Sequence, residues 1–151
     1  MHAWHLITIY PEQVTKDTCH STAAFISTGL ALNEDLKNLK TLDLSSNQII
    51  ALPTTVFKNL KEIDSINLMN NNITSLDEEL FKGLHSLKTL RLGSNQIRSI
   101  SVCLFSDTFN ITELDLSYNK IEKISTGSFD NLREASSMNL AGNQISIIEE
   151  N

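Results

Sequence analysis

The chain has 151 residues, of which 40% are hydrophobic and 20% are charged, and its formal net charge at pH 7 is -6. This composition is typical of an acidic globular protein long enough for one compact unit. The acidic balance and the absence of a basic stripe argue against nucleic acid as a partner, and without a run of about eighteen apolar residues we expect no membrane contact by this segment.

Residues 1–35 are expected to form a divergent N-terminal segment. The run from His5 to Tyr10 alternates enough for a strand, and residues 21–32 fit a degenerate coil or a short helix. The first residues lack the basic group that begins a signal peptide. Two interpretations stay open: a cap over the first exposed edge of a repeated structure, or the tail of a longer one.

From residue 36 onward the sequence repeats itself every 24 residues. Apolar residues precede each repeated asparagine at fixed distances, as Leu39, Leu42 and Leu44 do in the first copy, and no further copy is recognisable 24 residues earlier. A fixed period of this kind predicts a solenoid of about five coils. The repeated asparagines are Asn47, Asn71, Asn95, Asn119 and Asn143, and the phenylalanines that recur between them are Phe57, Phe81, Phe105 and Phe129.

Each copy predicts one short strand. Leu42, Asp43 and Leu44 alternate apolar and polar residues, which is the two-residue period of a strand with one buried face. Identical spacing stacks such strands in parallel, and the rest of each copy forms a return path that carries its phenylalanine inward. The asparagine lies where the chain leaves the strand, so its amide can pair backbone groups in a buried ladder.

The return path of the third copy departs from the pattern. Thr108 stands where the other copies have Leu60, Leu84 and Leu132, and Phe109 follows one place later. We expect Phe109 to turn inward and fill the place of the missing leucine. Because loops tolerate substitution, drift explains this irregularity better than a second contact site does.

These residues match the leucine-rich repeat consensus LxxLxLxxNxL, and the period with its phenylalanine resembles the typical subclass found in Toll-like receptor, Slit-like and chaoptin-like ectodomains. The resemblance covers about residues 36–151. It implies an α/β repeat solenoid in the form of a right-handed horseshoe arc, with a parallel β-sheet on the concave face and loops or short helical turns on the convex face. Because no polar cap follows the fifth copy, we interpret residues 36–151 as about five repeats of a longer array.

No set of residues predicts catalysis, a cofactor or a metal ion. The histidines and cysteines near the N-terminus match no zinc spacing, and the five glycines are scattered rather than gathered in a phosphate-binding loop. The register gives His85, the histidine within the repeats, no serine or cysteine partner. We therefore expect a binding protein and not an enzyme.

The side chains that face outward from the predicted sheet are the expected contact surface. Their central column is polar, with one cation, Arg91, among carboxylates and amides. Arg and Tyr are enriched in interface hot spots, and Met adapts to irregular partners. A simpler interpretation is a solvated face on which Arg91 pairs with Asp115 of the next copy. The predicted partner-binding residues of the concave face are Asp43, Asn67, Met69, Arg91, Asp115 and Tyr118.

Two features bear on the cellular compartment. Asn72 and Asn110 each begin an Asn-Ile-Thr acceptor for N-linked glycans at an outward position. The register does not bring Cys19 and Cys103 together, so we expect free thiols or partners outside this sequence.

The favoured hypothesis is the ligand-recognition part of an extracellular or cell-surface receptor or adhesion glycoprotein, as in innate immunity. Its partner would be a protein ligand or co-receptor. The alternative is an intracellular leucine-rich repeat scaffold or regulatory subunit, which would be cytoplasmic if the chain is complete as written.

Overall fold

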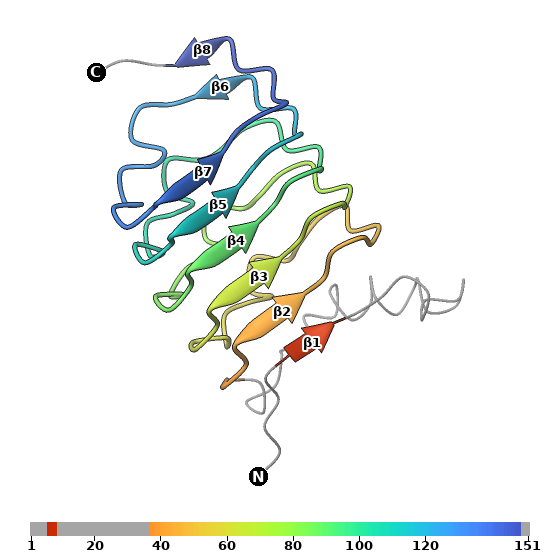
Figure 1. Cartoon of the computed structure of the whole chain (residues 1–151), viewed down its shortest axis with the longest axis vertical. Helices are drawn as coiled ribbons and strands as arrows, with labels where there is room; N and C mark the ends of the chain where they lie inside the picture. Colours follow the sequence, from red (N-terminus) through yellow and green to blue (C-terminus); the bar gives the residue numbers. More distant parts are fainter. Residues whose placement is uncertain (1–5, 9–36, 149–151) are drawn as a thin grey trace.

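The computed structural model describes residues 6–8 and 37–148, which form a solenoid whose coils each add one strand to a parallel sheet (Figure 1). The strands follow one another across this sheet in chain order. The return paths are turns at residues 54–59, 78–83, 102–107 and 126–131. The predicted parallel-sheet solenoid is thus confirmed. The strands are β1 (Leu6–Thr8), β2 (Thr41–Asp43), β3 (Ser65–Asn67), β4 (Thr89–Arg91), β5 (Glu113–Asp115) and β7 (Ser137–Asn139).

The sequence period sets the register of the sheet. The middle residues of successive strands pair in line, and those of β2 to β5 are at most 2% exposed because a coil covers them on either side. In β7, the last strand of the sheet, Met138 is 39% exposed. Burial of the apolar edge therefore depends on neighbouring coils, as expected for a solenoid. The aligned residues are Leu42, Ile66, Leu90, Leu114 and Met138.

β1 joins the sheet ahead of β2, with Ile7 beside Leu42 and Thr8 beside Asp43. A strand was expected between His5 and Tyr10, and Leu6–Thr8 form it. Ile7 and Leu42 are 35 residues apart, whereas Leu42 and Ile66 are 24 apart. This longer spacing is the reason that no copy is recognisable 24 residues before the first. The coil or helix expected at residues 21–32 lies outside the described residues.

The recurrent asparagines form a ladder of hydrogen bonds at the end of the sheet. Asn95 Nδ2 donates to the carbonyl oxygens of Leu92, at 3.0 Å, and of Leu68 on the preceding coil, at 2.9 Å. Its Oδ1 accepts the N–H of Ile73 at 3.0 Å. Asn71 and Asn119 make the same three contacts on their coils. Each side chain thus pairs backbone groups that the ends of the strands would leave without a partner.

The recurrent phenylalanines stack on the opposite side of the core. Phe57, Phe81 and Phe105 are at most 1% exposed, and Phe129 is partly buried. Successive ring centroids are 6.0, 6.5 and 6.0 Å apart. These rings fill the space between the sheet and the return paths, so the core runs the length of the described coils.

The third return path packs differently from the prediction. Thr108 is fully buried, and its Oγ1 donates to the carbonyl oxygen of Phe105 at 3.3 Å. Phe109 is 45% exposed and stacks on His85, with ring centroids 5.5 Å apart. The expected inward turn of Phe109 is therefore wrong. Threonine can occupy the leucine position because its hydroxyl finds a backbone acceptor, so the register need not shift.

A second, smaller sheet lies apart from the main one (Figure 1). It pairs β6 (Lys123–Ile124) with β8 (Ile147–Ile148) in parallel, and Ser99, which lies on the coil before β6, bridges to Lys123. The sequence pattern predicts a single strand per copy and places these residues in the return path. Parallel stacking of identical coils brings their extended segments side by side, so they also pair.

One buried hydroxyl of the fourth return path has no partner. Ser128 is 2% exposed and occupies the position that Val56, Leu80 and Leu104 fill in earlier coils. Among the residues that the structure describes, the Ser128 Oγ is the one buried side-chain oxygen or nitrogen that makes no hydrogen bond.

We expect Ser128→Ala to raise the free energy of unfolding by about 1 kcal/mol, because the variant removes a desolvated polar group. Urea denaturation followed by circular dichroism measures this change. Thr108→Val is the matched control, since it removes a buried hydroxyl that has an acceptor, and it should give no gain. Equal effects in the two variants would contradict the prediction.

Candidate functional site

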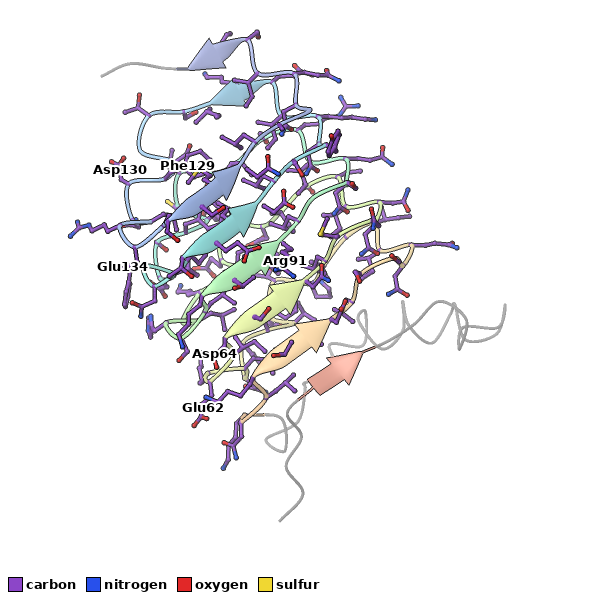
Figure 2. All side chains as sticks on the ribbon, viewed as in Figure 1. Glu62, Asp64, Arg91, Phe129, Asp130 and Glu134 are labelled. Atoms are coloured by element: carbon purple, nitrogen blue, oxygen red, sulfur yellow. The ribbon has the colours of Figure 1, made fainter. Side chains whose placement is uncertain are left out.

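The outward side of the main sheet carries most of the residues predicted to bind a partner. We call it the sheet face: the first and third side chains of β2 to β5 and β7, with the turn residues up to each ladder asparagine. In β2 to β5 the middle residue is buried and the first and third are half-buried. Arg91 lies over the middle of this sheet (Figure 2). The alternation of the strands therefore presents a polar surface above an apolar core.

Four of the five side chains in the central column fold back on their own coil. Asp43 Oδ1 accepts the N–H of Ser45 at 2.9 Å, and Asn67 Oδ1 accepts that of Met69 at 3.1 Å. A short Asp or Asn side chain makes this bond readily two residues before a turn amide. These residues thus stabilise the turn, a role that the sequence analysis did not assign to them. The same bond recurs from the third residue of β5 and of β7, Asp115 and Asn139, at 2.9 and 3.1 Å.

Arg91 is the exception in this column. Its guanidinium lies across to β5, where Nε donates to Glu113 Oε1 at 2.9 Å and Nη2 donates to Oε2 at 3.4 Å. Its partner is Glu113, so the pairing with Asp115 that the simpler interpretation named is wrong. The hydrogen bond that Arg91 donates to Glu113 raises the pKa of Arg91 further, and its guanidinium is charged at any usable pH. The two side chains are 44% and 40% exposed, so water screens their attraction.

Gly93, two residues beyond Arg91, lets the neighbouring coil approach closely. A Cβ at this position would lie 3.1 Å from Ser117 Oγ and 3.2 Å from Asp115 Oδ2. Asp115 therefore packs against the backbone of the preceding coil, while its other oxygen holds the turn. On the preceding coil, the position of Gly93 is taken by Met69, which is half-buried. Arg91, by contrast, reaches the neighbouring strand and its side chain is 44% exposed.

Tyr118 has a backbone conformation that its residue type rarely adopts. The residue before each ladder asparagine has a positive φ, and at Tyr118 it is 52°. Asn and Gly tolerate this region, whereas a bulky residue is strained there. The ring is 67% exposed and lies against Gly142 of the next coil, where an added Cβ would be 2.6 Å from Cδ1. Strain of this kind concentrates at functional sites.

Both predicted glycan acceptors are exposed. Asn110 precedes β5, and its Nδ2 donates to the carbonyl oxygen of His85 at 2.8 Å. Asn72 follows the ladder residue of its coil and borders a shallow groove of about 390 Å³. The two acceptors therefore lie at opposite ends of the strands. The other residues that line the groove are Gln48, Ile50, Thr74 and Gln96.

Cys103 is exposed and carries a free thiol, while Cys19 lies outside the described residues. Over residues 6–8 and 37–148, no group of three or more His, Cys, Asp or Glu side chains could hold a metal ion. No helix in the same ranges has the length and apolar character needed to cross a membrane.

Comparisons with solved structures identify similar solenoids. In the Toll–Spatzle complex from Drosophila, the TM-score is 0.69 and the identity 28% over 72% of this chain and 14% of that chain. In the complex of TLR13 with ssRNA13 the TM-score is 0.74 and the identity 36%, over 78% of this chain and 17% of that one. The leucine-rich repeat domain of APL1B shares the fold alone, with a TM-score of 0.68 and 20% identity over 95% of this chain and 38% of that one.

These neighbours also qualify the expectation about nucleic acid. The chain spans less than a fifth of the Toll and TLR13 chains, and the TLR13 structure is a complex with RNA. The fold is thus compatible with an RNA partner, contrary to the expectation from composition.

The family assignment comes from the sequence. No curated protein matches the chain. The family model described as "Leucine rich repeat" matches residues 37–97 and 86–145, the same coils that carry the asparagine ladder and the parallel sheet. The chain belongs to the leucine-rich repeat family.

Proposed function

We propose that this chain is a recognition module that binds a protein partner on its sheet face, as part of an extracellular receptor or adhesion protein. The observation that carries the proposal is the contrast within the sheet face. Asp43, Asn67 and Asp115 each use an oxygen to hold their own turn, whereas Arg91 lies across the sheet and Tyr118 is exposed in a strained conformation. Arg and Tyr are also the residue types enriched at interface hot spots.

The charges around Arg91 favour protein over RNA as the partner. Glu113 pairs with the guanidinium, and the charges of Asp115 and Asp43 also stabilise its cationic form. Phosphate groups would approach these carboxylates at an energetic cost, whereas a protein surface can present both signs of charge. The Toll–Spatzle complex is an instance of a similar solenoid in complex with a protein.

The Toll and TLR13 neighbours support the extracellular location rather than the intracellular scaffold. They also support binding rather than catalysis, since leucine-rich repeats of this kind act as binding modules. With these neighbours, a role in innate immunity is part of the proposal.

An array of secreted and cell-surface proteins, probed with the full chain fused to an antibody Fc region, tests the proposed function. We expect a partner whose affinity falls at least tenfold for the chain carrying both Arg91→Ala and Tyr118→Ala. The matched control combines Arg133→Ala with Phe109→Ala, an exposed Arg and an exposed aromatic residue outside the sheet face. This control should keep full affinity.

Unchanged affinity in the Arg91 and Tyr118 variant, with its melting temperature preserved, would contradict binding at this place. No partner on this array, together with a partner on a matching array of intracellular proteins, would instead favour the scaffold.

A further inference from the structure

The turn before β5 holds an exposed aromatic ring directly beside a glycan acceptor. Phe109 is 45% exposed and stacks on the imidazole of His85. The next residue, Asn110, donates from Nδ2 to the carbonyl oxygen of the same His85. Both side chains therefore converge on one residue of the preceding coil, which keeps the ring and the amide close together.

His85 is itself held in place. Its Nδ1 lies 3.0 Å from the carbonyl oxygen of Asp107, and the Asp107 carboxylate accepts the N–H of Gly83 at 2.8 Å. Thr112, which completes the acceptor sequence, donates its hydroxyl to the carbonyl oxygen of Lys88 at 3.2 Å. The platform that Phe109 occupies is thus tied to the third coil at several points.

We propose that Asn110 carries an N-linked glycan whose first sugar packs on the exposed ring of Phe109. This inference rests on the proposed extracellular location. The C–H face of a pyranose ring is apolar and slightly positive, and the face of an aromatic ring is negative, so the two attract each other. An exposed phenylalanine, otherwise unfavourable in water, then gains a partner, and the glycan stabilises the fold.

The chemistry of attachment suits this geometry. Nδ2 of Asn110 displaces the pyrophosphate of a lipid-linked oligosaccharide at the first carbon of the sugar. The new N–C bond replaces the sugar–phosphate bond, the lipid pyrophosphate leaves, and the amide gives up one proton. The second N–H remains on Nδ2 and can still donate to the His85 carbonyl oxygen.

Asn72 offers no such platform. The side chains that line the groove beside it are Gln48, Ile50, Thr74 and Gln96, none of which is aromatic. A glycan at Asn72 would therefore gain no stacking of this kind. Asn110 also precedes β5, whereas Tyr118 follows β5. A glycan on Asn110 therefore leaves the Tyr118 end of the sheet face open.

The first experiment measures occupancy. The full chain is secreted behind a cleavable leader from cells that make only high-mannose glycans, and its peptides are then mapped by mass spectrometry. We expect Asn110 to be glycosylated. Secreted chain without sugar on Asn110 would overturn the inference, whatever the state of Asn72.

The second experiment measures stability. Endoglycosidase H trims each glycan to a single sugar, and the melting temperature is compared with that of the same chain from bacteria, which carries none. Asn72→Gln in both preparations removes the other acceptor. We expect the single sugar on Asn110 to raise the melting temperature by about 2–4 °C.

Two variants show whether Phe109 is responsible. Phe109→Ala should abolish the gain, whereas Val102→Ala, which truncates another exposed apolar residue of the same return path, should keep it. An equal gain with and without Phe109 would overturn the stacking. Partner binding is measured separately with the Arg91 and Tyr118 variant, so failure of either proposal can be recognised alone.

Discussion

Asn95→Ala is expected to lower the free energy of unfolding by about 3 kcal/mol, because it leaves several buried backbone groups without partners. The Asn95 amide is 6% exposed and bonds the carbonyl oxygens of Leu92 and Leu68 and the N–H of Ile73. Two of these groups belong to the preceding coil, so the variant weakens the contact between coils as well as the turn. Alanine replaces none of these hydrogen bonds, and water cannot easily reach the groups.

The matched control for this prediction is Asn72→Ala, on the coil before Asn95. Asn72 is exposed, and its backbone N–H, which donates to the carbonyl oxygen of Ile49, is unaffected by the change. We expect a difference below about 0.5 kcal/mol for this variant. Urea denaturation of bacterially produced protein measures both. Equal stability of the two variants would mean that the ladder does not hold the coils together.

The parallel sheet could be predicted from the sequence because its cause is periodic. Identical spacing places Leu42, Ile66, Leu90 and Leu114 in one column, and no other register buries all of them. The position of β1 could not be predicted in this way, since the period fails before residue 36. Only the pairing of Ile7 with Leu42 reveals that a strand at a different sequence spacing adds to the sheet ahead of the first copy.

The sheet face was predicted less well. Asp or Asn recurs as the last residue of four strands, at Asp43, Asn67, Asp115 and Asn139, and this recurrence is itself a signal for the turn contacts that the structure shows. The partner of Arg91 could not be read from the sequence. Glu113 and Asp115 both lie on β5, and only side-chain geometry decides which carboxylate the guanidinium meets.

Phe109 shows the limit of assigning residues by pattern alone. A missing leucine at Thr108 suggested that the nearest aromatic residue would fill the gap. The hydroxyl of Thr108 instead bonds to Phe105 and stays in the core, and Phe109 remains outside beside Asn110. Phe81 and Phe109 lie in neighbouring return paths, yet Phe81 is buried in the core and Phe109 is exposed to solvent.

This contrast gives the prediction with the largest effect. Phe81 is fully buried and stacks between Phe57 and Phe105, with centroid distances of 6.0 and 6.5 Å. Phe81→Ala removes a ring from the middle of the column and leaves a cavity that packed coils cannot close. We expect it to lower the free energy of unfolding by about 3–5 kcal/mol. Urea denaturation provides the measurement. The free energy of unfolding, and its slope against urea concentration, are compared with those of the unmodified chain.

Phe109→Ala is the control, since it makes the same chemical change on the outside of the same solenoid. In unglycosylated protein this variant loses the contact with His85 but opens no cavity, so the expected loss is below about 1 kcal/mol. A gap of at least about 2 kcal/mol between the two variants is expected from their burial. Similar losses in both would mean that the phenylalanine column does not form the core between the sheet and the return paths. The coils would then depend on the sheet and the asparagine ladder alone.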